Sequence, residues 1–248
     1  MKGAIMQPTY MPWLGYFAMI DDVDIFVFLD DVQLNKRSWQ TRNRIKEHDE
    51  KELMLSISLK KSSRDETRIC DAIFANNEWK QKHLRCISQI YRKCKYYDEV
   101  FPWLEKIYLS SENRLSDFSI ALITSVCGYI GIKTKLIKSS NLDGIEGTKD
   151  ELLVNICKKV YIDTYLSAKG SATYIEAENP GGYFTKAGIG LEYQNYEHPI
   201  YEQKGKVFMP YMSVIDLLFN CGRRALEIIR SGVRESYTSE NVPISAEV

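Results

Sequence analysis

The fold is decided by residues 3–30, which read GAIMQPTYMPWLGYFAMIDDVDIFVFLD. Residues 3–6 form a short apolar run that ends at Gln7-Pro8, and residues 25–29 form a longer, continuous one. A continuous apolar run between polar residues is typical of a strand buried on both faces, as in a parallel sheet. Residues 14–20 carry apolar side chains at helical spacing. The segment therefore predicts a strand, a turn, a helix and a second strand.

Strand and helix patterns alternate along the rest of the chain. Residues 53–59 alternate with a period of two, which predicts a half-exposed strand. Helices are predicted to open at Asn77 and at Pro102, and to span residues 115–130. The other predicted elements are a strand at 133–138, a helix at 148–160, a strand at 161–166 and a helix from Ser213 to Gly222. We therefore predict an α/β fold with a mostly parallel sheet, flanking helices and a helical insertion around residues 76–131.

The chain shows no internal repeat, low-complexity tract or linker that would divide it. Its 248 residues are enough to bury one large core. Apolar residues become sparse from about residue 231 onward. We therefore predict a single domain over residues 1–230 and a mobile C-terminal tail over residues 231–248.

Charge and composition argue against several functional classes. The chain has 33 basic and 33 acidic side chains, so its formal net charge is zero. Nucleic-acid-binding proteins and proteins held on acidic membranes usually carry a basic excess. No apolar run is long enough to span a bilayer, and the first residues lack the apolar stretch of a signal peptide. We expect a cytoplasmic protein with no membrane span and no nucleic-acid partner.

The cysteines and histidines form no local metal-binding pattern. Six cysteines stand singly, without a Cys-x-x-Cys pair, and the chain has three histidines. We expect free thiols and no metal site, and the spacing ranks none of the cysteines as a nucleophile. The Walker A, Gly-x-Gly-x-x-Gly, Gly-x-Ser-x-Gly and His-Glu-x-x-His motifs are also absent. Their absence argues against P-loop kinases, NAD dehydrogenases, α/β-hydrolases and zinc proteases.

The first of three candidate site segments is the turn at residues 7–16. Two prolines and Gly15 restrain the backbone where a predicted strand leads into a helix. In open α/β sheets, ligands lie beyond the carboxyl ends of the strands, and a helix N-terminus there favours anions. Gln7, Tyr10 and Trp13 are therefore candidates for substrate binding. The alternative is a rigid turn with aromatic packing.

The second candidate segment follows the next predicted strand. A carboxylate placed by a buried strand, here Asp30, can orient a nucleophile or accept a proton. Basic side chains that can bind phosphate follow within the next residues. The substrate-binding candidates of this segment are Gln33, Lys36, Arg37, Trp39, Arg42 and Asn43. The alternative is a solvated basic loop, but the closeness of the first segment on an adjacent strand favours function.

The third candidate segment has the sequence EHPIYEQ and contains His198. Histidine is the side chain whose ordinary pKa makes it a base near neutral pH. His198 is therefore the candidate catalytic base, and Tyr201 and Gln203 are substrate-binding candidates. Of the other histidines, His83 lies on a predicted helix face and is at least equally suited to a structural role, and His48 is predicted in an exposed loop.

These segments resemble the pattern of the WbqC-like protein family. The resemblance covers nearly the whole chain to about residue 230. The matching motifs are IMQPTYMPWLGYF at 5–17, DIFVFLDDVQ at 24–33, KRSWQTRN at 36–43, YLS at 165–167 with Gly170, HPIYEQ at 198–203 and SVIDLLFNCG at 213–222. One departure is Ala168, which stands where the family pattern has a glycine.

The resemblance implies a bacterial cytoplasmic protein of O-antigen or capsular polysaccharide biosynthesis. The reaction that we expect from it is acyl or aminoacyl transfer, which forms an amide on the amino group of a nucleotide-linked amino sugar. The donor would be an acyl thioester of coenzyme A or of an acyl or peptidyl carrier protein, and no tightly bound cofactor is expected. The attacking amine needs a base, for which His198 and Asp30 are suited. Cationic side chains would bind the diphosphate, and aromatic ones the sugar and the base.

Two other functions stay open. The strand, turn, helix and strand at the start resemble the opening of nucleotidylyltransferase-type folds. Those folds carry a His-x-Gly-His signature, whereas this turn has Trp13-Leu14-Gly15-Tyr16. A non-catalytic scaffold of the polysaccharide pathway is the third interpretation. The sugar, the donor, the oligomeric state, the participation of a metal and a catalytic role for any cysteine do not follow from the sequence.

Overall fold

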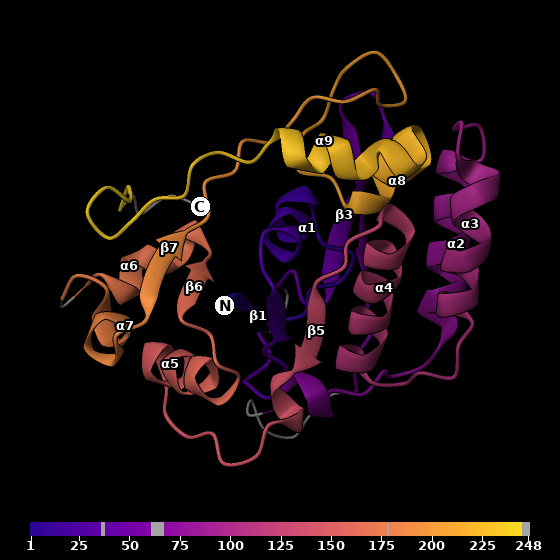
Figure 1. The fold of residues 1–248 in the computed structure, drawn as a ribbon. Coiled ribbons are helices and arrows are strands. Elements are labelled where there is room, and N and C mark those ends of the chain that lie inside the picture. Colours follow the sequence, from indigo (N-terminus) through magenta and orange to yellow (C-terminus); the bar gives the residue numbers. More distant parts are fainter. Residues whose placement is uncertain (36–37, 61–66, 178, 245–248) are drawn as a thin grey trace.

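The computed structural model describes residues 1–35, 38–60, 67–177 and 179–244. The described chain forms a five-stranded parallel sheet and a separate antiparallel hairpin (Figure 1). The strands of the large sheet are β1 (Lys2–Met6), β2 (Ile25–Phe28), β5 (Lys135–Lys138), β6 (Thr164–Ser167) and β7 (Gly190–Tyr193). The strands of the hairpin are β3 (Arg42–His48) and β4 (Lys51–Ser56). The predicted α/β fold with a mostly parallel sheet is confirmed.

The order of strands in the large sheet is β5-β2-β1-β6-β7. The chain thus adds strands first on one side of β1 and then on the other. On the first side, α1 (Leu14–Asp21) joins β1 to β2, and α4 (Leu115–Ile130) precedes β5. The later connections use α5 (Lys149–Lys159), α6 (Ala172–Ile175) and α7 (Gly182–Ala187). This is a doubly wound sheet, and the strand order reverses between β1 and β6, where ligands of such sheets usually bind.

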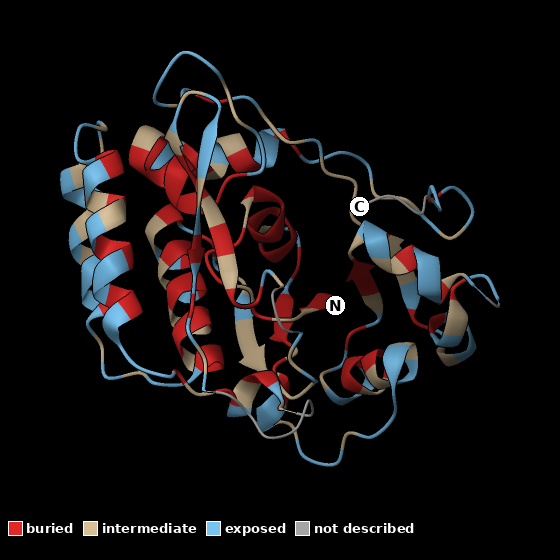
Figure 2. Cartoon of the chain, turned by 180° about the vertical axis from the view of Figure 1, so that it is seen from behind, coloured by how far each residue is buried: buried red, intermediate tan, exposed pale blue. Residues whose placement is uncertain are grey.

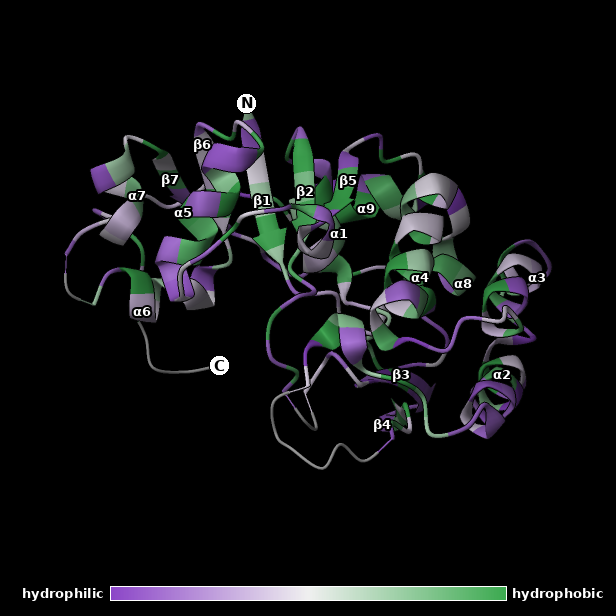
Figure 3. Ribbon diagram, turned by 90° about the horizontal axis from the view of Figure 1, so that it is seen from below, coloured by the Kyte–Doolittle hydropathy of each residue, from purple (hydrophilic) through white to green (hydrophobic). Residues whose placement is uncertain are grey.

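Alternate side chains of the strands enter two cores on opposite faces of the sheet. Ala4 and Phe26 belong to the larger core, together with α1 and α4. Ile5 and Val27 belong to the smaller core, together with α5 and α7. Figure 2 shows α1 almost wholly buried, and Figure 3 shows the hydrophobic residues of β1 and β2. Because helices cover both faces, the central strands read as continuous apolar runs.

The remaining helices extend the larger core, and those predicted within residues 76–131 are confirmed. These remaining helices are α2 (Glu78–Tyr91), α3 (Tyr97–Tyr108), α8 (Val214–Cys221) and α9 (Ala225–Ser231). The short 3₁₀ helices are η1 (Ile69–Asp71), η2 (Ser139–Asn141), η3 (Lys169–Ser171) and η4 (Gly222–Arg224). Pro102 does not open α3 as predicted but lies inside it. Ser213 caps α8, and Gly222 ends it with a φ of 59°. Within the described residues, no helix is long and apolar enough to cross a membrane.

Two segments differ from the sequence-based expectation. Strand β3 lies in a stretch that reads as a polar loop, because Ile45 is its one apolar residue. The expected mobile tail packs against β7: Tyr237 exchanges backbone hydrogen bonds with Tyr193, and the side chain of Val242 is buried in the smaller core. A few buried side chains hold this segment against the sheet, so its low average content of apolar residues did not predict that it packs. Residues 245–248 lie outside the described residues.

Candidate functional site

The carboxyl ends of the parallel strands bring two of the predicted segments to one edge of the sheet. Gln7 follows β1, and Asp30 follows β2 one strand away. Ser139 follows β5 on the other side of β2, and Ser167 ends β6 at the point where the strand order reverses. This edge is where ligands of doubly wound sheets bind.

Asp30 is buried at this edge and is fully engaged in hydrogen bonds. Its carboxylate accepts from the Ser116 hydroxyl at 2.8 Å, and from both the backbone N–H and the hydroxyl of Ser140 at 3.0 Å. Ser139 donates to Asp30 and to Asp31. The donors come from the start of α4 and from η2. We call these five residues the Asp30 cluster; it ties the ends of β2, β5 and α4 together.

The turn after β1 is held from inside the protein. Tyr10 is fully buried, and its hydroxyl is hydrogen-bonded to Nδ1 of His83 at 2.7 Å and to the Tyr108 hydroxyl. Asn43 donates from its side-chain amide to the carbonyls of Tyr10 and Met11 at 3.0 and 2.7 Å. Met11 adopts a φ of 46°, which is unfavourable for a side chain of this size. Tyr10 and Asn43 thus shape the turn from within.

His83 is a buried structural partner of this turn. Its ring packs between the aromatic rings of Tyr10 and Trp79, with centroid distances of 5.8 and 5.1 Å. Burial lowers the pKa of His83 from 6.5 to about 4. The side chain is therefore neutral at physiological pH.

His198 lies in a group of aromatic side chains that we call the His198 cluster. Its members are Trp13, Tyr196, His198, Tyr201, Phe208 and Tyr211. The imidazole stacks on Trp13 with ring planes 12° apart and meets Tyr211 at a centroid distance of 4.9 Å. Trp13 follows β1, and His198 follows β7, so the cluster joins the two sides of the strand-order reversal. The structure thus brings the first and third predicted segments together.

The hydrogen bonding of His198 defines its chemical state. Nδ1 lies 2.9 Å from the carbonyl oxygen of Pro199, which can only accept, so Nδ1 carries the proton. Nε2 therefore presents a lone pair. This nitrogen is buried and has no hydrogen-bond partner within the described residues. Burial also lowers the pKa of His198, which favours the neutral base.

A buried carboxylate lies behind the His198 cluster. Asp216 is fully buried in α8 and accepts from the hydroxyls of Tyr91 and Tyr201, both at 2.8 Å, and from the Gln203 amide at 2.7 Å. Burial raises the pKa of Asp216, although its hydrogen bonds act in the opposite direction. Tyr201 also contacts the ring of His198. Tyr201 and Gln203 thus connect the candidate base to Asp216.

Two aromatic side chains of this region are exposed: Tyr211, which belongs to the His198 cluster, and Trp39. Trp39 is 50% exposed and Tyr211 is 49% exposed. The Arg44 guanidinium lies 5.8 Å from the Trp39 ring centroid, and its Nε donates to the Tyr211 carbonyl at 3.2 Å. Tyr211 has a φ of 60°, which is rare for an aromatic residue. We call Trp13, Trp39, Arg44 and Tyr211 the aromatic surface.

The other predicted site residues are distributed around these clusters. The Gln40 amide donates to Gln7. Gln33 is exposed, and the half-exposed Arg42 makes no side-chain hydrogen bond or ion pair to another described residue. Lys36 and Arg37 lie outside the described residues. The Asp30 cluster and the His198 cluster share no residue, so the two candidate bases are not a hydrogen-bonded pair.

Sequence reasoning missed several residues of the site. They are Arg44, Tyr91, Ser116, Ser139, Ser140, Tyr196, Tyr211 and Asp216. The position of Asp216, three residues after Ser213, was noticed in the sequence, but this spacing was interpreted as a helix cap. The serines come from segments distant in sequence, and no sequence pattern indicated that they belong to the site.

The described residues hold no cluster of metal ligands, and burial raises the pKa of four of the cysteine thiols. No group of three or more His, Cys, Asp or Glu side chains in the described part of the chain could hold a metal ion. Burial raises the pKa of Cys94 and Cys221 to about 11, and that of Cys127 and Cys157 to about 12. These four thiols are therefore protonated at neutral pH.

Comparisons with known proteins identify the family. The sequence profile of the WbqC-like protein family matches residues 7–228, which include all three candidate segments. The "Uncharacterized protein Rv1507c" of Mycobacterium tuberculosis is 31% identical over 231 residues, which cover 92% of this chain and 97% of that protein. No solved structure matches the chain. The chain belongs to the WbqC-like protein family.

Proposed function

We propose that the protein is a transferase of cell-surface polysaccharide biosynthesis. It forms an amide on the amino group of a nucleotide-linked amino sugar, with an acyl or aminoacyl thioester of coenzyme A or of a carrier protein as donor. The observation that carries the proposal is the buried, unpartnered Nε2 of His198. A neutral imidazole with a free lone pair suits a base that acts on a bound sugar nucleotide. Because Nε2 is buried, the substrate amine reaches it only when the surrounding aromatic rings, of which Tyr211 is half exposed, move on binding.

The proposed reaction requires one proton acceptor. The sugar amine attacks the thioester carbonyl, so that a C–N bond forms and the C–S bond breaks. Nε2 of His198 accepts the proton that the attacking nitrogen loses, and returns it to the leaving thiolate. The hydrogen bond from Nδ1 to Pro199 stabilises the tautomer that this step needs. The lowered pKa of His198 keeps the base unprotonated at neutral pH.

The aromatic surface would bind the nucleotide. Trp39 and Tyr211 offer exposed faces on which a nucleobase or a sugar can stack. Arg42 and Arg44 are the nearby described cations for a diphosphate, and Arg44 is already oriented by Tyr211 and by Glu52 at 3.0 Å. Lys36 and Arg37 are proposed for the same role from the sequence.

The remaining predicted residues are proposed to position the site. Asp30 can accept a proton from a substrate only if it gives up hydrogen bonds from its serines. We therefore assign Asp30 to positioning the strand ends, and not to the role of a second base. Gln7 and Gln33, at or near the same edge of the sheet, would contact the sugar. Tyr10, Asn43, Tyr201 and Gln203 support the turn and the His198 cluster from inside.

The strand order favours a second candidate function. If the five parallel strands are numbered 1 to 5 in chain order, their order across the sheet is 3-2-1-4-5. The sheet thus extends in both directions from the reversal between β1 and β6, as in nucleotide-binding doubly wound sheets. A nucleotide-activating enzyme would bind ATP phosphates at the turn before α1. This is an analogy at the level of the fold, and the turn lacks the histidines of nucleotidylyltransferases.

Native mass spectrometry of the purified protein distinguishes these functions. The panel holds nucleotide sugars with a 3-amino or 4-amino group, the matched sugars with a hydroxyl in its place, ATP and coenzyme A. The transferase proposal expects retention of an amino sugar nucleotide over its hydroxyl counterpart. Retention of ATP alone would support the nucleotide-activating enzyme, and retention of none of these ligands would favour the scaffold.

A further inference from the structure

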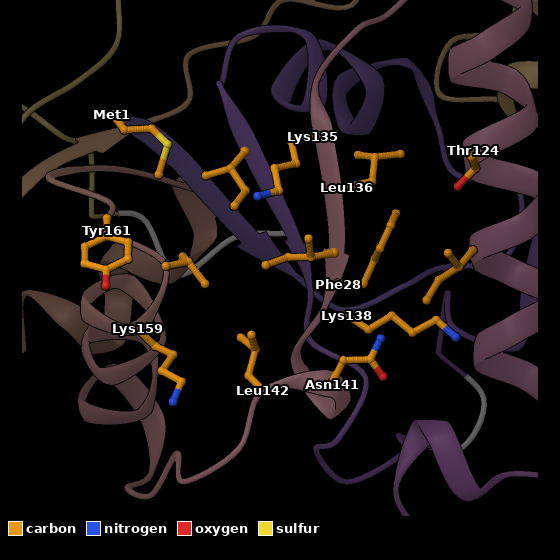
Figure 4. Close-up of a pocket in the computed structure, with 14 residues that line it drawn as sticks. Met1, Phe28, Thr124, Lys135, Leu136, Lys138, Asn141, Leu142, Lys159 and Tyr161 are labelled. Carbon is orange, nitrogen blue, oxygen red and sulfur yellow. The ribbon is translucent and has the colours of Figure 1, made fainter.

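A groove of about 840 Å³ follows β5 at the edge of the large sheet (Figure 4). Strand β5 is one of the two edge strands, with β7 at the other edge, and it pairs only with β2 in the described sheet. One wall of the groove comes from α4, at Thr124, and the other from the end of α5, at Lys159 and Tyr161. Apolar side chains such as Leu136 and Leu142 line it between these walls. The groove is separate from the His198 cluster.

The open edge of β5 offers backbone hydrogen-bonding groups. Lys135 donates its backbone N–H to the carbonyl of Asp24 at 3.2 Å and therefore faces β2. Because backbone groups alternate in direction along a strand, Ile137 also faces β2, and the N–H and C=O groups of Leu136 and the N–H of Lys138 face away from it. The Lys138 carbonyl is already used, because Lys138 is the N-cap of η2. No described strand pairs with these outward groups. They can receive an added strand.

The rim of the groove carries features that burial of the core does not explain. Tyr161 is 83% exposed, although its side chain is aromatic. Its φ of 63° has a local cause, because Tyr161 follows the end of α5 in a left-handed conformation, with Ile162 donating its backbone N–H to the Cys157 carbonyl at 2.9 Å. Lys135 and Lys159 have no ion-pair partner within the described residues, whereas Lys138 pairs with Asp117. Lysines on an edge strand also discourage aggregation. That role alone would not require a lined groove or an exposed tyrosine beside it.

The spacing of the lysines argues against a second copy of this chain as the occupant. A symmetric antiparallel pair of β5 edges has Leu136 opposite Leu136 or Ile137 opposite Ile137, because residues opposite each other point to the same face. The first pairing brings the Lys135 side chains of the two copies diagonally across the pair, and the second does the same for Lys138. Like charges at these neighbouring positions repel each other. A segment with carboxylates at these positions would gain from the same geometry.

We infer that the β5 edge binds an extended acidic segment of a partner protein, which joins the sheet as a sixth strand. Its backbone pairs with the outward groups of Leu136 and Lys138, and its carboxylates face Lys135 and Lys159. An aliphatic side chain lies over the apolar floor beside Tyr161. In such strand addition, backbone hydrogen bonds supply affinity and alternate side chains supply specificity.

Fluorescence anisotropy with labelled peptides tests the inference. The probes are short peptides in which Glu alternates with Val or Ile, made in two versions that start with Glu or with the aliphatic residue. The same peptides with Lys in place of Glu are the controls. We expect the Glu peptides to bind more tightly. The double variant Lys135→Glu/Lys159→Glu should lose about tenfold in affinity, and Lys93→Glu, an exposed lysine on the loop after α2, should lose none. Equal binding of Glu and Lys peptides, or an unaffected double variant, would overturn the inference.

Two further measurements separate strand addition from simple charge attraction. Hydrogen exchange of the Leu136 and Lys138 amides should slow when a Glu peptide binds, because only these amides gain a partner. Tyr161→Gly should weaken peptide binding while raising the melting temperature, because glycine relieves the positive φ. If the wild-type protein instead forms a dimer in which the Leu136 and Lys138 amides are protected from exchange, the edge pairs with a second copy, and the inference is wrong.

Discussion

The hydroxyl of Tyr201 donates a 2.8 Å hydrogen bond to Oδ2 of Asp216, while its ring contacts that of His198 at a centroid distance of 6.2 Å. The candidate base is thus packed against a side chain that a fully buried carboxylate holds in place. Tyr91 and Gln203 complete the acceptor set of Asp216. The orientation of the His198 cluster therefore depends on a residue of α8 that does not touch His198.

Asp216→Asn should lower stability, and most strongly at low pH. Asparagine has one acceptor oxygen where Asp216 has two, so Tyr91 or the pair Tyr201 and Gln203 must lose its acceptor, and we expect the free energy of unfolding to fall by about 2 kcal/mol. Burial raises the Asp216 pKa above 3.8, so the folded protein binds this proton more tightly than the unfolded chain. The wild type therefore loses stability from this group as pH rises above 3.8, and Asn does not. Urea unfolding at several pH values should show that the difference in the free energy of unfolding between wild type and Asp216→Asn narrows as the pH rises. A difference that widens with rising pH would argue against a raised pKa of Asp216.

His83→Gln should change the pH dependence in the opposite direction. The pKa of His83 is about 4 in the folded protein, against 6.5 ordinarily. The folded protein thus binds this proton more weakly, and the wild type loses up to about 3 kcal/mol from this group as pH falls from 6.5 to 4. Glutamine cannot ionise, so the free energy of unfolding of the His83→Gln variant, measured by denaturant unfolding, should fall less over this pH range than that of the wild type. The exposed His48, changed to Gln, serves as control, and an equal effect of both variants would exclude the buried group as the cause.

Gly15→Ala should disturb the His198 cluster through Trp13. A Cβ at Gly15 would lie 2.3 Å from Cη2 of the Trp13 indole, so the ring must leave its present stacking position on His198. We expect a loss of about 1–3 kcal/mol in stability and a changed near-ultraviolet circular dichroism spectrum. Gly128→Ala is the matched control, because nothing lies within 4 Å of a Cβ added there in α4. That variant should gain about 0.5–1 kcal/mol, and a similar loss in both would mean that contact with Trp13 is not the cause.

Trp39→Ala should weaken ligand binding without unfolding the protein. Trp39 is half exposed, so its removal should change the free energy of unfolding by no more than about 0.5 kcal/mol. Loss of a stacking face should weaken the binding of a nucleotide sugar about tenfold in calorimetric titration. Tyr183→Ala removes an aromatic ring of similar exposure from α7 and should leave the affinity unchanged. Equal affinities of wild type and Trp39→Ala would remove Trp39 from the proposed site.

The parallel sheet could be predicted because its central strands are buried on both faces. Such strands read as continuous apolar runs, as residues 25–28 do. Strand β3 could not be predicted, because Asn43 and Lys46 are buried there by specific hydrogen bonds and not by apolar character. The strand order, which places Trp13 beside His198, follows from three-dimensional packing and has no local sequence signal.

Within the candidate site, the sequence indicated residue types better than their surroundings. His198 was identified by its chemistry and by the following proline, and the structure adds the tautomer and the unpartnered Nε2. Asp30 was identified by its place after a buried strand. Its burial could not be predicted, because Ser116 and Ser139 lie 86 and 109 residues away in sequence.

The rate of amide formation is the most direct test of His198 as the base. Purified wild type, His198→Gln and His48→Gln are compared by mass spectrometry, with an amino sugar nucleotide retained in the native binding experiment and a panel of acyl thioesters. We expect His198→Gln to lose about 10²–10⁴-fold in rate while it still binds the nucleotide and unfolds at the wild-type temperature. His48→Gln should keep the wild-type rate. An undiminished rate in folded His198→Gln would contradict the proposed role of His198.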